Sequence, residues 1–275
     1  MCRLANFQSP TASRLKIGVI GDPHTEQVNK RVAQVARTAV SGRHGDSIGD
    51  KHMPTRIYIV RHGETELTAE DRFSGSTDVP LSDAGRAQIT ALAERLRCDE
   101  LDAVYASPMV RTLEAARIIS APHGLEPRLE PGLREIDYGR WEGRLRGELE
   151  AEHAQEYDAW QEDPLTVAPQ GGESGIQVLA RVLPVLRRIV QSHRRRSVLL
   201  VSHKGTIRLL ISSLLGFDAR GYRDRLEQSP GALNILDFTS DVRARLRLFN
   251  DSSHYQDLPA RAYKQGLSRW WRAPG

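Results

Sequence analysis

Cysteine is scarce in this sequence of 275 residues, which contains only Cys2 and Cys98. Neither cysteine lies in the close spacing typical of a zinc site or a redox pair, and two cysteines cannot build a disulfide-rich scaffold. Long hydrophobic runs are also missing, because no apolar stretch approaches the roughly 20 residues of a membrane span. The first 30 residues lack the apolar segment of a secretory signal. We therefore expect a cytoplasmic protein with no membrane partner.

The basic excess of the chain is small and is confined to one end. The formal net charge is +4, and residues 1–52 hold eight Lys and Arg against four Asp and Glu. The remaining residues hold 31 side chains of each sign. A nucleic-acid-binding domain concentrates basic side chains on one face of its folded part. The neutral body of the chain therefore predicts no nucleic-acid partner.

The chain divides into an extension, a domain and a tail. Residues 1–52 are polar and lack sustained periodicity, so we interpret them as an N-terminal extension whose composition is compatible with disorder. Residues 53–255 are predicted to form one domain, and 256–275 a C-terminal tail. Within the extension, Asp22-Pro23-His24 ends a strand-like run and resembles the opening of a metallophosphoesterase. The later Gly-Asn-His motif of that class is absent, so we expect no metal site.

From residue 56 onward, short apolar runs alternate with charged segments of helical period. The apolar runs are 57–61, 102–106 and 197–202, and the helical segments are 82–96, 108–120 and 204–215. This alternation predicts an α/β fold with a mainly parallel sheet and helices on both faces. Two further runs, 232–238 and 244–249, predict a hairpin at one edge of the sheet.

Two segments between the second and third runs have a different character. Residues 175–192 have the pattern of a helix but contain Pro184, where we expect a kink or a break. Residues 137–172 are polar, rich in Glu, Trp and Gly, and interrupted by prolines. We interpret 137–172 as an insertion that covers the site and contacts the substrate.

The segment Arg61-His62-Gly63-Glu64-Thr65 directly follows the first apolar run. A neutral histidine keeps a lone pair on one ring nitrogen and can accept a phosphoryl group, while an adjacent arginine offsets the charge of the phosphoryl oxygens. Gly63 would let the backbone approach a ligand closely. The pattern therefore predicts that His62 is a nucleophile in phosphoryl transfer.

Two other strand ends are expected beside this one, because the carboxyl ends of parallel strands share one edge of a sheet. The second apolar run leads to Ser107 and then to Arg111 in the first turn of a helix. The third leads to His203, again at a helix start, where backbone N–H groups favour bound phosphate. An acid is also needed to protonate the leaving oxygen. Spacing alone does not choose among the three candidates, Glu135, Asp137 and Glu142.

These motifs together resemble the histidine phosphatase superfamily, also called the phosphoglycerate-mutase-like superfamily. The resemblance is carried, in the family's order, by 61–65, 72–75, 107–111, 133–143 and 202–203. It implies a three-layer sandwich of the phosphoglycerate-mutase-like type. It also implies a phosphatase that needs neither metal nor cofactor and acts through phosphohistidine.

The resemblance also implies roles for individual residues. His62 would become the phosphohistidine, and Glu135 would act as the general acid and later as the base that activates water, with Asp137 as the alternative. Three side chains would surround the phosphoryl group: Arg61, Arg111 and His203. The candidate substrate-binding residues are Arg61, Thr65, Thr68, Ser74, Gly75, Arg111 and Lys204.

The stretch 138–143 resembles the phosphatase branch of the family, and the chain is short of the insertion typical of mutases. The resemblance therefore implies hydrolysis of a small phosphorylated metabolite, of the phosphosugar or phosphoglycerate type. A phosphoglycerate-type mutase and a non-catalytic phospho-ligand-binding regulator are the alternatives. Thr68, Ser74 and Lys204 depart from the family pattern, which leaves the substrate open. A homodimer is compatible with the sequence.

Overall fold

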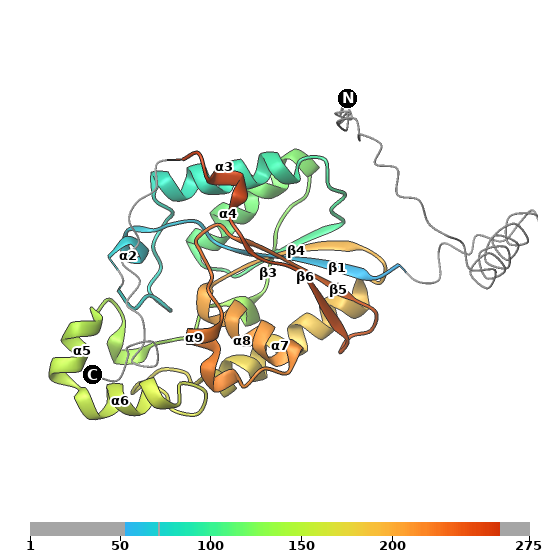
Figure 1. Cartoon of the computed structure of the whole chain (residues 1–275). Helices are drawn as coiled ribbons and strands as arrows, with labels where there is room; N and C mark the ends of the chain where they lie inside the picture. Colours follow the sequence, from blue (N-terminus) through green and yellow to red (C-terminus); the bar gives the residue numbers. More distant parts are fainter. Residues whose placement is uncertain (1–52, 71, 259–275) are drawn as a thin grey trace, which may run out of the picture. The chain divides into compact units, whose positions relative to one another are not determined.

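A six-stranded sheet with helices on both faces forms the centre of the described chain (Figure 1). The structure is a computed structural model that describes residues 53–70 and 72–258. Its strands stand in the order β3-β2-β4-β1-β5-β6. Their bounds are β1 Thr55–Arg61, β2 Ala103–Ala106, β3 Arg128–Leu129, β4 Ser197–Ser202, β5 Leu233–Phe238 and β6 Ala244–Asp251.

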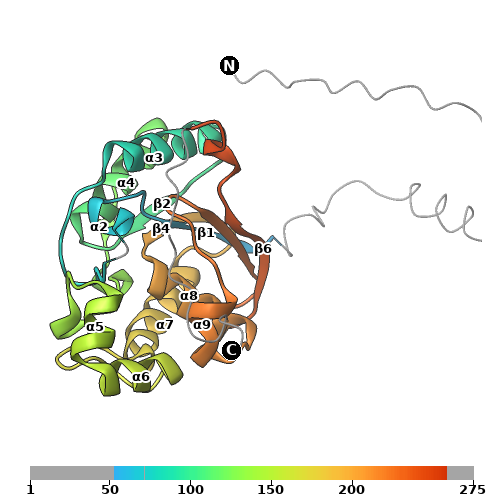
Figure 2. The ribbon, with the colours of Figure 1, turned by 60° about the vertical axis from the view of Figure 1, so that its left-hand side comes forward.

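Helices α3 and α4 cover one face of the sheet, and α7 and α8 cover the other (Figures 1 and 2). The helices of the described residues are α2 Glu66–Ala69, α3 Asp83–Leu96, α4 Val110–Ser120, α5 Arg146–Glu152, α6 Ala154–Glu162, α7 Gly175–Ser192, α8 Lys204–Leu215 and α9 Tyr222–Arg225. Short 3₁₀ turns lie at Ala121–His123, Pro131–Leu133, Gly139–Trp141, Ala219–Gly221 and Ser253–Tyr255.

Alternate side chains of the central strands pack against opposite helix layers. Ile57 and Ile59 of β1 belong to the core cluster beneath α7 and α8, while Tyr58 and Val60 belong to the cluster beneath α3 and α4. Strands buried on both faces have near-continuous apolar sequences, which is why these runs were recognisable. Neighbours from β3 to β1 are parallel. The structure therefore confirms the predicted α/β fold with a mainly parallel sheet.

The predicted hairpin is also confirmed. Strand β5 pairs antiparallel with both β1 and β6, so the hairpin adds the last two strands at one edge of the sheet. Its second strand extends to Asp251, slightly beyond the apolar run.

Of the kink or break predicted at Pro184, the break is wrong, because α7 is continuous from Gly175 to Ser192. Ser174 and Gln177 form a capping box at its start. Val182 and Leu186, on either side of the proline, are fully buried against the sheet. Pro184 lies on the exposed side. Burial of the apolar face stabilises the helix and offsets the hydrogen bond that proline cannot make.

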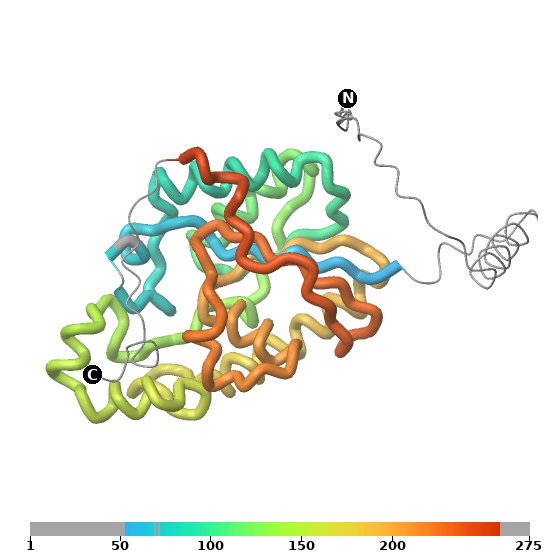
Figure 3. The backbone as a smooth tube through the Cα atoms, in the orientation of Figure 1, coloured from blue at the N-terminus to red at the C-terminus, as the bar shows by residue number. Residues whose placement is uncertain are grey.

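Segment 137–172 carries α5 and α6 and forms a small lobe beside the layered part, as the yellow-green tube in Figure 3 shows. The lobe has a mainly aromatic cluster in which Trp141, Leu149, Tyr157 and Trp160 pack with Phe73 from outside the segment. Its T-shaped ring pairs include Trp141 and Trp160, whose centroids are 5.2 Å apart.

The interpretations of residues 1–52, including Asp22-Pro23-His24, and of 259–275 lie outside the described residues. Within the described part, no helix is both long and apolar enough to cross a membrane.

Candidate active site

His62 lies just beyond the end of β1, where its hydrogen bonds fix one tautomer. The Nδ1 atom lies 2.7 Å from the carbonyl oxygen of Gly63. A carbonyl can only accept, so Nδ1 carries the proton and the lone pair is on Nε2. Burial, with smaller effects from Arg111 and Arg61, holds the pKa of His62 well below its usual range. The ring is therefore neutral and nucleophilic at physiological pH.

His203 follows β4 and is fully buried. Its Nδ1 accepts a hydrogen bond from Nε of Arg111 at 3.3 Å, so Nε2 carries the proton and donates to Oγ of Ser107 at 2.8 Å. Burial and the charge of Arg111 keep the pKa of His203 well below its usual range. The two histidine rings meet edge to face, with centroids 5.1 Å apart. The strand ends thus bring His62 and His203 together as predicted.

Two buried arginines flank the histidines. Arg61 donates from Nη1 to the carbonyl of Gln228 at 2.6 Å, and Gln228 is held in turn by Asn234. Arg111 donates to the carbonyl oxygens of Thr77 and Gly75 at 2.8 and 2.9 Å. Both guanidinium groups are therefore fixed by backbone acceptors.

Glu135 caps helix α8 from outside the helix. Its carboxylate accepts from the backbone N–H groups of Gly205 and Thr206 at 2.9 and 3.0 Å, which belong to the first turn. His203 occupies the N-cap position but makes no side-chain cap bond. A Cβ atom on Gly205 would lie 2.9 Å from Oε1 of Glu135, so glycine permits this approach. The carboxylate is thereby held at a helix N-terminus, close to His203.

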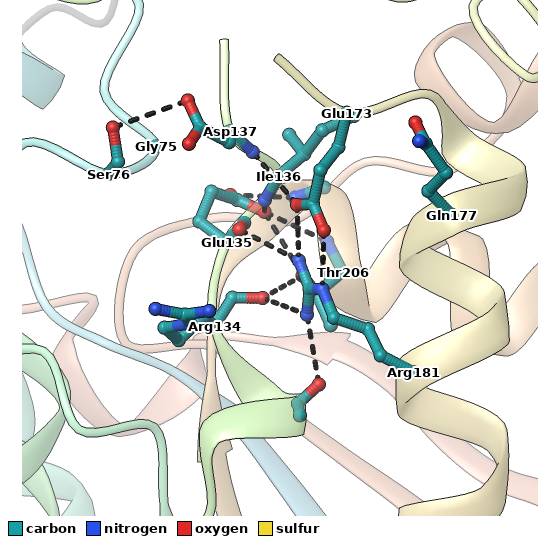
Figure 4. A network of polar contacts seen from close by, with 12 residues as sticks. Gly75, Ser76, Arg134, Glu135, Ile136, Asp137, Glu173, Gln177, Arg181 and Thr206 are labelled. Atoms are coloured by element: carbon teal, nitrogen blue, oxygen red, sulfur yellow. Dashed lines mark hydrogen bonds and ion pairs between the residues drawn. The ribbon is translucent and has the colours of Figure 1, made fainter. Parts of the chain in front are cut away.

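Arg181 of α7 fixes the loop that carries Glu135 (Figure 4). Its guanidinium donates to the carbonyl oxygens of Gly132, Arg134 and Glu135 at 2.8 to 2.9 Å. It also forms an ion pair with Glu173 at 2.8 Å. One side chain therefore satisfies three carbonyl oxygens in a stretch of four residues.

The two other candidate acids have structural hydrogen bonds. Asp137 accepts from the backbone N–H of Gly139 at 2.8 Å. Glu142 accepts from three successive N–H groups of the loop at Gly75, Ser76 and Thr77. Neither carboxylate lines the cavity described next, whereas Glu135 does.

A cavity open to solvent lies beside His62. The predicted site residues in its lining are Arg61, His62, Thr68, Ser74, Glu135 and Lys204. Arg111 and His203 are fully buried and do not contribute to the lining. Thr65 caps α2 through its hydroxyl, and the backbone of Gly75 binds Arg111 and Glu142, so these two belong to the framework.

Gly63 was expected to let backbone approach a ligand, but a neighbouring element takes up that space. A Cβ atom on Gly63 would lie 2.4 Å from the carbonyl oxygen of Gly85 in the first turn of α3. The glycine thus permits close packing of α3 against the loop after β1.

Several residues of the cavity were not predicted as site residues from the sequence. The lobe contributes Tyr138, Arg146 and Trp160, and the lining also includes Arg72, Phe73, Arg208, Tyr222 and Arg223. Arg208 lies one turn after Lys204 on α8, so helical periodicity could have indicated it. Arg223 and Trp160 come together only in the tertiary structure, with the guanidinium 3.9 Å from the ring centroid.

The described residues contain no group of three or more His, Cys, Asp or Glu side chains that could hold a metal ion. Charge in the cavity comes from arginine and lysine instead. The fold, with a cationic cavity at the carboxyl edge of its parallel strands, defines an α/β enzyme that acts on phosphate esters.

The chain belongs to the histidine phosphatase superfamily (branch 1), whose family model matches residues 57–252. It is accordingly a phosphoric monoester hydrolase, a phosphatase of small phosphate esters. The family membership and the phosphoglycerate-mutase-like fold predicted from the motifs are therefore confirmed.

Its relatives include enzymes with named substrates. The chain is 36% identical over 163 residues to phosphoserine phosphatase 1 of Hydrogenobacter thermophilus, an alignment covering 59% of this chain and 77% of that protein. It is 31% identical over 196 residues to adenosylcobalamin/alpha-ribazole phosphatase of Escherichia coli, covering 71% and 95%. The solved mycobacterial glucosyl-3-phosphoglycerate phosphatase with VO3 matches with a TM-score of 0.65 and 31% identity, covering 71% and 98%.

Proposed function

We propose that the protein hydrolyses small phosphomonoesters of the phosphosugar or phosphoglycerate type, without metal, through a phosphohistidine at His62. The observation that carries this proposal is the tautomer of His62. Its Nδ1–H faces the carbonyl of Gly63, which leaves the Nε2 lone pair on a neutral ring at a cationic cavity. The sequence-based expectation of a cytoplasmic location stays a prediction.

In the first step, the lone pair of His62 Nε2 attacks phosphorus as the ester P–O bond breaks, and Glu135 gives its proton to the leaving alkoxide. In the second step, Glu135 takes a proton from water, which attacks phosphorus as the P–N bond breaks and releases phosphate. Arg61 and Arg111 supply positive charge to the phosphoryl oxygens. His203, which is neutral in the resting enzyme, orients Arg111 by a hydrogen bond.

The proposal is tested by phosphate release from a panel of phosphomonoesters in the presence of EDTA. We expect the parent to release free phosphate and His62→Ala to lose at least about 10⁴-fold in kcat/KM, as when other covalent nucleophiles are removed. His123→Ala, outside the cavity, is the matched control. Loss of activity with EDTA, or its retention in His62→Ala, would contradict the mechanism. Movement of phosphate to another hydroxyl of the substrate would indicate a mutase.

A further inference from the structure

The cavity carries more positive charge than a single phosphoryl group needs. Among the described residues that line it, Glu135 is the only carboxylate, whereas six side chains are cationic: Arg61, Arg72, Arg146, Lys204, Arg208 and Arg223. Arg72 is paired with Glu70 at the surface. Arg61 lies next to His62 and serves the reacting phosphoryl group. Arg208 on α8 and Arg223 on α9 therefore need another explanation.

Arg208 is the most informative of these cations. Arg208 is only 8% exposed. Among the residues that the structure describes, its Nε atom has no hydrogen-bond partner and its guanidinium group forms no ion pair. Burial and the nearby charge of Arg61 lower the pKa of Arg208 to about 10, so it remains charged at neutral pH. A buried charge without a partner is unfavourable, and an anion bound in the cavity would relieve that cost.

A second polar group beside the cavity is also unpartnered. Tyr222, in the short helix α9, is fully buried, and its hydroxyl makes no hydrogen bond within the described chain. Burial raises the pKa of Tyr222 to about 12, so the hydroxyl keeps its proton and can donate. Arg208 and Tyr222 thus offer unused donors to the same cavity.

Arg223 is held in place by the lobe. Its guanidinium stacks on the ring of Trp160 and donates from Nη1 to Oε1 of Gln161 at 2.9 Å. Stacking fixes the plane of the guanidinium, so fewer rotamers are lost when it binds an anion. Three donors from α8 and α9 therefore line one cavity with a preset arrangement.

We propose that Arg208, Tyr222 and Arg223 form a second anion subsite, which selects phosphomonoesters whose leaving group carries a carboxylate or a second phosphate. The inference rests on the proposed function and defines the class of its substrates. A neutral leaving group would leave Arg208 buried and unpaired. An anionic one accepts from both guanidinium groups and the phenol while the phosphoryl group meets His62.

The test compares esters that differ only in this second group. In the parent, kcat/KM should be about 10- to 100-fold higher for 3-phosphoglycerate than for glycerol 3-phosphate, or for propane-1,3-diol bisphosphate than for its monophosphate, as charged hydrogen bonds allow. A preference in one pair identifies the anion as carboxylate or phosphate. Equal kcat/KM within both pairs would overturn the subsite.

Variants assign the preference to these residues. The ratio of kcat/KM for the ester with the second anion to kcat/KM for its matched neutral ester should fall about 10- to 100-fold in Arg208→Gln. It should fall a few-fold in Tyr222→Phe. Arg220→Gln, an exposed arginine paired with Asp218, should retain the ratio. An unchanged ratio in Arg208→Gln would contradict the inference. Should that variant fail to fold, Tyr222→Phe decides.

Failure of the proposed function is distinguishable from failure of the subsite. Absence of His62-dependent release from p-nitrophenyl phosphate, which has no second anion, would count against the function alone. The subsite is then judged by calorimetric binding of 3-phosphonopropionate and propylphosphonate. The subsite is supported if 3-phosphonopropionate binds more tightly than propylphosphonate and Arg208→Gln abolishes that difference. Equal binding of the two ligands to the parent overturns the subsite.

Discussion

Two neighbouring histidines, His62 and His203, are held in opposite tautomers by different partners. A backbone carbonyl keeps the proton of His62 on Nδ1, whereas Arg111 and Ser107 keep that of His203 on Nε2. Identical side chains therefore have different chemistry, one with an accepting nitrogen beside the cavity and one turned toward Arg111. The resemblance implies that His203 lies beside the phosphoryl group, and its lowered pKa means that it would do so as a neutral ring.

The role of Glu135 as the general acid is tested by comparing esters whose leaving groups differ in their need for a proton. Glu135→Gln keeps the size of the side chain and one of the two oxygens that accept from the N–H groups of α8, but it has no proton to give. We expect kcat for an alkyl phosphate to fall about 10²- to 10⁴-fold, with a much smaller loss for p-nitrophenyl phosphate, whose leaving group needs no acid. Steady-state kinetics on both esters measure this difference. Asp137→Asn is the control, and a larger leaving-group effect there than in Glu135→Gln would assign the acid to Asp137.

At the scale of elements, α7 and α8 position the acid from two sides. Helix α8 offers N–H groups to the carboxylate, while Arg181 of α7 binds the backbone on either side of it. Neither helix is near Glu135 in sequence, so its placement depends on both helices packing on the same face of the sheet.

Arg181→Met should uncouple the loop of Glu135 from α7. Loss of its charged hydrogen bonds leaves three carbonyls and Glu173 without this partner, so we expect about 2 to 3 kcal/mol less stability. We also expect kcat for alkyl phosphates to fall more than kcat for p-nitrophenyl phosphate, because the acid is displaced. Urea unfolding and kinetics measure the two effects. The exposed Arg187→Met on the same helix should change stability by less than about 0.5 kcal/mol. Equal losses of kcat on both esters would argue against a positioning role.

For the whole molecule, buried histidines predict sensitivity to acid. Burial lowers the pKa of His62 and His203 strongly and that of His254 to about 4. Below about pH 6.5 the histidines of the unfolded chain bind protons that those of the folded protein do not. The free energy of unfolding therefore decreases as the pH is lowered. As the pH falls from about 6.5 to 5.5, each of these histidines should lower the free energy of unfolding by about 1 kcal/mol.

Urea unfolding at about pH 7 and about pH 5.5 tests this prediction. His254→Gln, outside the cavity, should lose about 1 kcal/mol less than the parent on acidification. His123→Gln, in the turn that follows α4, is the matched control. The same loss in His254→Gln and the parent would show that acid acts through other groups.

The sequence alone indicated strands β1, β2, β4, β5 and β6 and helices α3, α4, α7 and α8, because residues buried on both faces of a sheet give continuous apolar runs and helices give a 3.6-residue period. It also indicated His62, since a strand end is a local feature. The tertiary structure decided what depends on distant segments. It placed Glu135 and not Asp137 in the lining of the cavity, kept α7 continuous at Pro184, and filled the space at Gly63 with α3. It also gathered Arg208, Tyr222 and Arg223 around one cavity, because their common position results from packing between helices and not from any local pattern.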